Sequence, residues 1–107
     1  MEVRVLGPVE VDRDGAALVP GGLKQRTVLA LLIAARGRAV SVDALIDGVY
    51  GERAAPGARR TLATYISNLR HVLGDVIGRS GDGYQLDLGD IEVDAFQFED
   101  EYRSGTT

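Results

Sequence analysis

Residues 58–73 have the sequence ARRTLATYISNLRHVL, and the spacing of their apolar side chains predicts an amphipathic helix. Four apolar residues recur at i, i+4, i+7 and i+11 and so share one stripe along a helix: Leu62, Ile66, Leu69 and Leu73. The opposite face carries polar side chains but no carboxylate: Arg60, Thr61, Thr64, Ser67, Asn68 and His71. Solvated helix faces usually include Asp or Glu. The strip is therefore either an unusual solvated face or a surface suited to contacting base edges.

Two more helices are predicted upstream of this one. Residues 23–36 carry a broad apolar stripe, and Gly37 provides a C-terminal stop. Residues 42–49 form a short second helix, with Ser41 as the expected N-cap and Asp43 as a favourable charge in the first turn. A short polar loop then leads to the third helix.

Both ends of the chain show further periodic patterns. The first twenty residues alternate apolar and charged side chains, which is the period-2 pattern of half-buried strands. Asp14-Gly15 is a strong two-residue hairpin motif, and residues 16–19 are predicted to return as a third strand. Near the other end, residues 94–102 have the apolar spacing of a helix.

The segment after the third helix completes the predicted fold. Residues 76–79 and 84–88 are predicted strands joined by a hairpin loop at 81–83. An N-terminal antiparallel sheet, three helices and a C-terminal β-hairpin, in that order, indicate an α+β winged helix-turn-helix. In this fold the third helix enters the major groove of DNA and the hairpin, or wing, lies along the backbone. We therefore expect a recognition helix at about 58–73 and a wing at 76–88.

The distribution of charge supports a polyanionic partner. The formal net charge is −4, but residues 21–80 carry nine Lys and Arg against four Asp and Glu. Residues 81–107 carry one Arg against eight acids. A basic middle between acidic ends favours a charged polymer as the partner of the middle.

The composition disfavours an enzyme. The chain has no Cys, which excludes disulfides and thiolate metal sites, and His71 is the single histidine. The glycines at 78–83 lie in a predicted hairpin rather than before a helix, so they do not resemble a phosphate-binding loop. We expect no catalysis, no metal and no cofactor.

The sequence also favours a cytoplasmic location without membrane contact. The longest apolar run, 28–35, is far shorter than the roughly 18–20 residues that a membrane span needs. The first eight residues lack the basic-then-apolar pattern of a signal peptide.

Four stretches resemble OmpR-type winged helices and, in particular, the SARP family of bacterial antibiotic-pathway activators: VLGPVEV at 5–11, LKQRTVLALL at 23–32, RTLATYISNLR at 60–70 and GYQL at 83–86. The resemblance spans residues 3–88 in the right order and spacing. It implies a four-stranded N-terminal sheet, in which residues 16–19 are followed by a short further element, then three helices and a wing. It also implies that residues 1–90 are the DNA-binding domain. Residues 91–107 would be a linker and the start of a truncated helical activation domain.

The chain departs from the family pattern at two places. Tyr50-Gly51 stands where the family usually has Trp-Gly at the end of the second helix, so an aromatic ring is retained. Gln85 stands two residues after the wing glycine, where many relatives carry Arg. Strand alternation predicts that Tyr84 and Leu86 face inward and that Gln85 points outward. The resemblance implies that Gln85 then faces the minor groove.

Candidate roles follow from side-chain chemistry together with the resemblance. Thr64 and Asn68 are the principal base-edge candidates, because an amide donates and accepts and a threonine offers a methyl and a hydroxyl. The other base-contact candidates are Arg60, Thr61, Ser67 and His71. The candidates for the DNA backbone are Lys24, Arg26, Arg59, Arg70 and Arg79. For Arg70 an ion pair with an acid near the first helix is the alternative.

The resemblance implies double-stranded promoter DNA as the partner, with RNA polymerase as a further one. We expect head-to-tail binding of two copies on direct repeats, because no self-complementary dimer helix is evident. The alternative is a winged helix that binds proteins and not DNA. Steep salt dependence would distinguish a DNA binder, and an exposed apolar patch would distinguish a protein binder.

Overall fold

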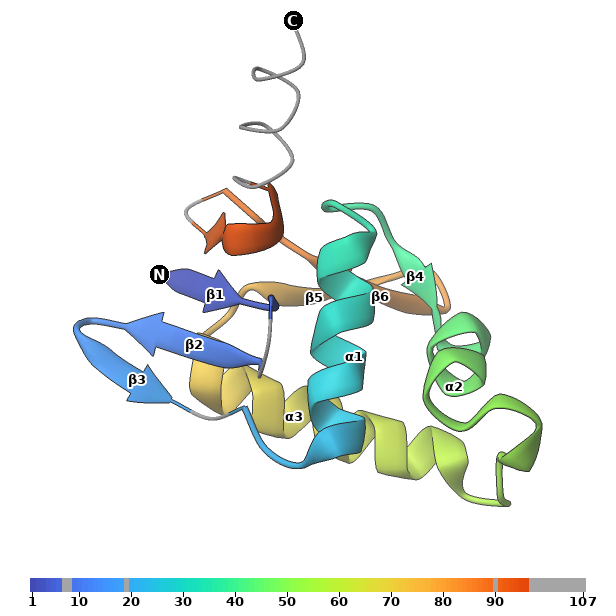
Figure 1. The fold of residues 1–107 in the computed structure, drawn as a ribbon. Coiled ribbons are helices and arrows are strands. Elements are labelled where there is room, and N and C mark those ends of the chain that lie inside the picture. Colours follow the sequence, from blue (N-terminus) through green and yellow to red (C-terminus); the bar gives the residue numbers. More distant parts are fainter. Residues whose placement is uncertain (7–8, 19, 90, 97–107) are drawn as a thin grey trace, which may run out of the picture.

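The computed structural model describes residues 1–6, 9–18, 20–89 and 91–96 of the chain. The long helices within them are α1 (Leu23–Ala34), α2 (Val42–Tyr50) and α3 (Ala58–Leu73), with a short 3-10 turn, η1 (Gly51–Arg53), after α2. Two small sheets flank the helices (Figure 1).

The first sheet combines strands from both ends of the described chain. Its order is β3-β2-β1-β7, formed by β3 (Ala16–Leu18), β2 (Glu10–Arg13), β1 (Glu2–Arg4) and β7 (Glu92–Val93). The three N-terminal strands are antiparallel, as predicted, whereas β7 pairs in parallel with β1. The sequence analysis expected a short element after residues 16–19 to complete the four-stranded sheet, and this prediction is wrong. Residues 20–22 form no strand, and β7 occupies the fourth position.

The second sheet contains the wing. Strands β5 (Ile77–Ser80) and β6 (Gly83–Leu86) form the predicted hairpin, and β4 (Val40–Ser41) pairs with the other edge of β6. Ser80 pairs directly with Gly83, so the turn consists of the two residues 81–82 rather than the predicted three. Strand β4 was not predicted. It joins the wing to the start of α2.

The helices begin and end close to their predicted limits. Helix α3 has its predicted bounds, because its apolar stripe runs unbroken between two glycine caps. Helix α1 ends two residues early, since Arg36 and Gly37 adopt φ values of +52° and +86° and turn the chain back. Ser41 caps α2 as expected, its Oγ accepting a hydrogen bond of 3.1 Å from the backbone N–H of Ala44.

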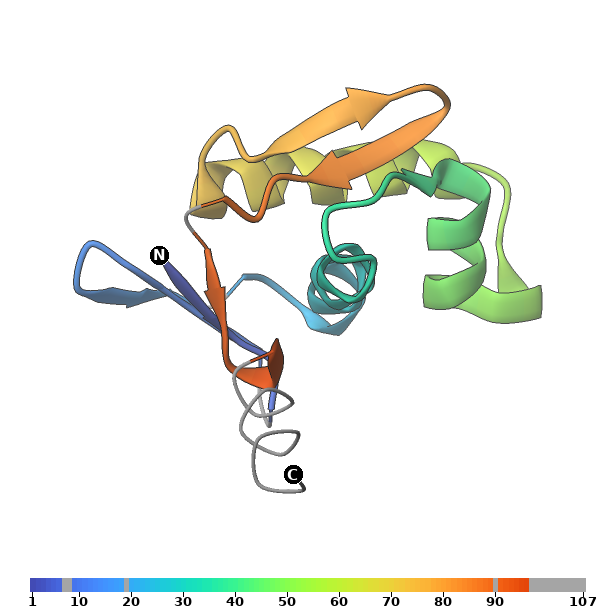
Figure 2. The same ribbon diagram turned by 90° about the horizontal axis from the view of Figure 1, so that it is seen from above.

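Helix α1 lies at the centre of the core. Viewed nearly along its axis, it has the first sheet on one side, α3 and the wing on another, and α2 on a third (Figure 2). Val28, Leu29 and Leu32 of α1 are completely buried. The surrounding elements each contribute buried residues to the same cluster: Val3, Val11, Leu45, Leu62, Ile66, Leu69, Tyr84, Leu86 and Val93. The whole apolar stripe of α3 is therefore buried in this shared core.

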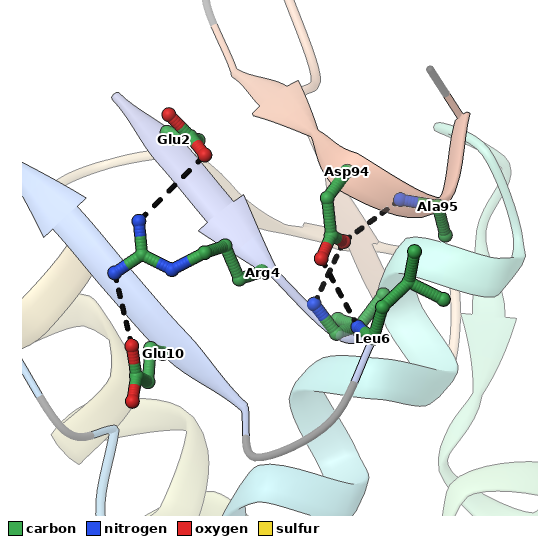
Figure 3. A network of polar contacts seen from close by, with 7 residues as sticks. Glu2, Arg4, Leu6, Glu10, Asp94 and Ala95 are labelled. Atoms are coloured by element: carbon green, nitrogen blue, oxygen red, sulfur yellow. Dashed lines mark hydrogen bonds and ion pairs between the residues drawn. The ribbon is translucent and has the colours of Figure 1, made fainter. Parts of the chain in front are cut away.

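The segment after the wing packs back on the first sheet. Val93 is buried, and the Asp94 carboxylate accepts hydrogen bonds from the backbone N–H groups of Val5 (2.8 Å) and Leu6 (3.1 Å) (Figure 3). Residues 94–96 are helical, and the rest of the helix expected at 94–102 lies outside the described residues. The assignment of residues 91–107 to a linker and a second domain stays a prediction, while the described part of this segment contacts the core.

Candidate nucleic-acid interface

The polar strip of α3 faces solvent along the whole helix. The four residues of the apolar stripe are buried, and all six predicted base-contact residues are exposed: Arg60, Thr61, Thr64, Ser67, Asn68 and His71. The Thr61 and Thr64 hydroxyls donate to the carbonyls of Gly57 and Arg60, each at 3.3 Å. These threonines therefore present a methyl group and an acceptor oxygen, with the hydroxyl proton used inside the helix.

Asn68 is held by a residue that the sequence analysis did not select. Its Nδ2 donates to Oε1 of Gln25, in the first turn of α1, at 3.1 Å. Gln25 is 7% exposed, and its Nε2 donates to the Pro20 carbonyl at 2.9 Å. The indication was present in the sequence, because a polar residue three positions before Val28 interrupts the buried face of α1.

Two of the predicted backbone-contact arginines brace α3. Nη2 of Arg59 lies 2.6 Å from Oδ1 of Asp43 at the start of α2, and both side chains are exposed. Nε of Arg70 donates to the Ile77 carbonyl of the wing at 2.9 Å, and its guanidinium lies 5.9 Å from the centre of the Tyr84 ring. Arg70 thus contacts the wing rather than an acid near the first helix, so that alternative is wrong.

The start of α1 carries the two other upstream cations. Nζ of Lys24 lies 4.8 Å from the ring centre of Tyr50, a cation–π contact with an exposed head group. Burial raises the pKa of Tyr50, and its hydrogen bond with Tyr65 of α3 acts in the same direction. The Nε atom of Arg26 is buried and has no hydrogen-bond acceptor within the described residues. Tyr50, which ends α2 at the position where the family usually has Trp, thus contacts Lys24 of α1 and Tyr65 of α3.

The wing places one cation and one amide at its surface. Arg79 is exposed, and its Nη1 donates to the Tyr84 hydroxyl at 3.1 Å. Tyr84 and Leu86 are buried and Gln85 is exposed, which confirms the predicted alternation. Nε2 of Gln85 donates to the Gly37 carbonyl at 2.6 Å, so its amide bridges the wing to the turn after α1. This contact could not be read from strand alternation.

A hollow of about 400 Å³ lies beside Gln85 on the wing. Asp75 and Asp87 line it together with Arg79 and Gly37. The two carboxylates make this part of the wing surface less favourable to phosphate than the cations on α3 and α1. Taken together, the predicted site residues lie on three parts of the fold, namely α3, the start of α1 and the wing.

Three packed helices, with an exposed third helix beside a two-stranded hairpin, define a winged helix-turn-helix domain of the DNA-binding class. The family described as "Transcriptional regulatory protein, C terminal" matches residues 17–86. The chain belongs to this family of OmpR-type DNA-binding domains and is of the SARP type found in bacterial transcriptional regulators.

Several characterised proteins are similar to this chain. Transcriptional regulatory protein EmbR of Mycobacterium tuberculosis is 37% identical over 112 residues, which cover 98% of this chain and 29% of EmbR. Regulatory protein DnrI of Streptomyces peucetius is 31% identical, with 92% of this chain and 41% of DnrI covered. AfsR of Streptomyces coelicolor is 43% identical over 77% of this chain and 8% of its own length. The chain thus spans less than half of each of these relatives.

A solved structure shares the fold. Mycobacterium tuberculosis EmbR in complex with a low affinity phosphopeptide superposes with a TM-score of 0.77 and 38% sequence identity. The match covers 83% of this chain and 25% of the EmbR chain. Among the described residues, no helix is long and apolar enough to cross a membrane.

Proposed function

We propose that this chain binds double-stranded promoter DNA sequence-specifically as the reading domain of a bacterial transcriptional activator. Helix α3 would lie in the major groove and the wing, residues 76–88, on the backbone or in the minor groove. The observation that carries the proposal is the exposed strip of α3, which holds six polar or basic residues and no carboxylate. A carboxylate there would face the phosphates and be repelled.

The candidates are proposed to act in two ways, some by contacting base edges and others as cations that position the domain on DNA. Thr64 and Asn68 would contact base edges, and the other strip residues either bases or phosphates. Lys24 and Arg26 would contact phosphates beside the start of α1, where Gly22 provides no side-chain cap. Arg59, Arg70 and Arg79 already have protein partners, so their proposed phosphate contacts would use their remaining N–H groups.

The assembly on DNA is proposed from the family. Two copies would bind head to tail on direct repeats, in the cytoplasm, and would contact RNA polymerase there. A winged helix that binds only proteins would need an apolar docking surface. Leu6 and Leu23 are the large apolar side chains exposed in the described part of the chain, one after β1 and one at the start of α1. Leu23 begins α1, whereas Val5, next to Leu6, lines a hollow with Ile33 and Ala34 at the end of the same helix, so the two leucines lie apart.

Asn68→Ala and Lys24→Ala test the division between reading and positioning. Asn68→Ala is expected to weaken binding to the preferred sequence by about 1–3 kcal/mol and to relax preference at one base position. Lys24→Ala is expected to weaken all duplexes alike and to lower the salt slope by about one counterion. Titration of preferred and random duplexes at several salt concentrations measures both effects.

Arg4→Ala provides a charge-matched control. Arg4 lies in the first sheet, and its Nη2 is 3.0 Å from Oε2 of Glu10, so its removal should leave the salt slope unchanged. If Asn68→Ala and Lys24→Ala weaken preferred and random DNA equally, the proposed division is wrong. If the unaltered chain shows no salt-dependent binding, the protein-binding alternative replaces the proposal.

Gln85→Arg tests the proposed minor-groove contact of the wing. An arginine is expected to tighten binding, add about one unit to the salt slope and increase the preference for A·T-rich flanks. The expected gain is only a few-fold, because Asp75 and Asp87 line the same hollow and compete for the new charge. Two duplexes that differ only in their flanks measure the effect. No gain on either duplex would place this part of the wing away from the groove.

A further inference from the structure

Gln25 is buried in the first turn of α1, where this turn meets α3. Among the described residues, Gln25 is the polar side chain that is buried with the apolar core, and both ends of its amide have hydrogen-bond partners. Nε2 donates to the Pro20 carbonyl at 2.9 Å, and Oε1 accepts from Nδ2 of Asn68 at 3.1 Å. One end is therefore anchored inside the domain, and the other holds an exposed side chain on the proposed DNA face.

The turn before α1 is shaped around this amide. Pro20 is fully buried, and Gly21 has a φ of +93°, which favours glycine. A Cβ at position 21 would lie 2.7 Å from Cδ of Gln25, so any other residue would displace the amide. Because Nε2 is held by the Pro20 carbonyl, Oε1 is the end of the amide that is left to face Asn68.

This arrangement limits how Asn68 can face DNA. The edge of an asparagine that pairs with adenine consists of Oδ1 and one N–H, and the amide has a second N–H that needs another acceptor. Gln25 supplies that acceptor. A flipped Asn68 amide would place its oxygen against Oε1 of Gln25, with two acceptors facing each other. Gln25 therefore sets which atom of Asn68 accepts and which donates.

We infer that Gln25 is a specificity-determining positioning residue, which orients Asn68 to favour adenine at the base that it contacts. The inference rests on the proposed function. Because Asn68 is ordered before DNA arrives, less side-chain freedom is lost on binding. The ordering of one such side chain corresponds to a factor of about 2–10 in affinity.

Three variants and a randomised duplex library, sequenced after selection, test the inference. Gln25→Met retains the length of the side chain but offers no acceptor, and is expected to lower the adenine preference at one position about 2- to 10-fold. Gln25→Glu keeps an acceptor for Asn68 while losing the donor to Pro20, so it should lose stability and retain the preference. Val28→Ala loosens the core of α1 without touching Asn68, and should also retain the preference.

The outcomes separate the inference from the proposed function. In an Asn68→Ala background, Gln25→Met should cause no further change in preference. The positioning role is overturned if Asn68→Ala abolishes a base preference that Gln25→Met leaves intact. It is also overturned if Gln25→Glu loses the adenine preference as fully as Gln25→Met does. If Asn68→Ala changes no preference, the proposed reading and the inference both fail.

If Gln25→Met fails to fold, an NMR measurement on the unaltered chain tests whether Gln25 holds the Asn68 amide in solution. One of the two side-chain amide protons of Asn68 is expected to be protected from exchange and to show a nuclear Overhauser effect to the Gln25 side chain. Equal exchange of the two protons would overturn the inference.

Discussion

Gly83→Ala is expected to lower the free energy of unfolding by about 3 kcal/mol and to separate the wing from β4. Gly83 begins β6 and pairs with Ser41 of β4 on one side and Ser80 on the other. A Cβ at this position would lie 2.7 Å from the carbonyl carbon of Val40 and 2.8 Å from Cα of Ser41. These are backbone atoms, which cannot swing aside as a side chain does. Strand β4 must therefore separate from the wing.

Gly78→Ala is the matched control for this prediction. Gly78 lies in the other strand of the same hairpin, and a Cβ there would meet nothing within 4 Å. Chemical denaturation of both variants measures the difference, and Gly78→Ala is expected to change stability by less than about 0.5 kcal/mol. Equal stability of the two variants would show that the Gly83 contact is not a constraint. The Asp82 carbonyl, next to Gly83 in the wing turn, accepts a hydrogen bond of 3.1 Å from the backbone N–H of Val42 at the start of α2. Separation of β4 from the wing would break this bond. DNA affinity should therefore fall together with stability in Gly83→Ala and stay unchanged in Gly78→Ala.

Truncation after Gly89 is expected to cost at least about 4 kcal/mol, which is a large part of the stability of a small domain. It removes the buried side chain of Val93 and the pairing of β7 with β1. It also leaves the N–H groups of Val5 and Leu6 without the Asp94 carboxylate (Figure 3). Phe96 is lost as well, with the contact of its ring to the Arg36 guanidinium at 4.1 Å.

Point substitutions in the full chain apportion this loss. Val93→Ala and Asp94→Ala together should account for most of the effect, whereas Glu92→Ala, on the exposed side of the same strand, should cost little. Urea unfolding of the full chain, the truncated chain and the three point variants gives the comparison. A truncated chain as stable as the full one would mean that the fold ends at the wing and that β7 is dispensable.

The longer elements could be predicted because their patterns are long. The apolar stripe of α3 recurs through most of a sixteen-residue helix, so the period of the helix and its end at Gly74 were both evident. Strands β4 and β7 have two residues each, too few for alternation to be visible. Both exist because tertiary pairing holds them, β4 against Tyr84 and Gly83 of the wing and β7 against Val3 of β1.

The candidate site was predictable in outline but not in its contacts. Exposure of the α3 strip follows from helical periodicity. The contacts of Asn68 with Gln25 and of Gln85 with Gly37 join residues 43 and 48 positions apart, and no local pattern reports such distances. Arg59 and Arg70 were correctly read as cations of α3, but which neighbour each would meet depended on how α2 and the wing pack.

The parallel pairing of the first and last strands has a consequence for synthesis. Val5 and Asp94 are 89 positions apart, yet the edge of β1 is completed only by the segment that contains Asp94. A chain emerging from the ribosome therefore carries β1 with an unpaired edge until almost the whole domain has left the tunnel. Contacts so distant in sequence form slowly, because a long loop must close first. The nascent domain is thus expected to resist proteolysis abruptly, only once residue 96 has cleared the exit.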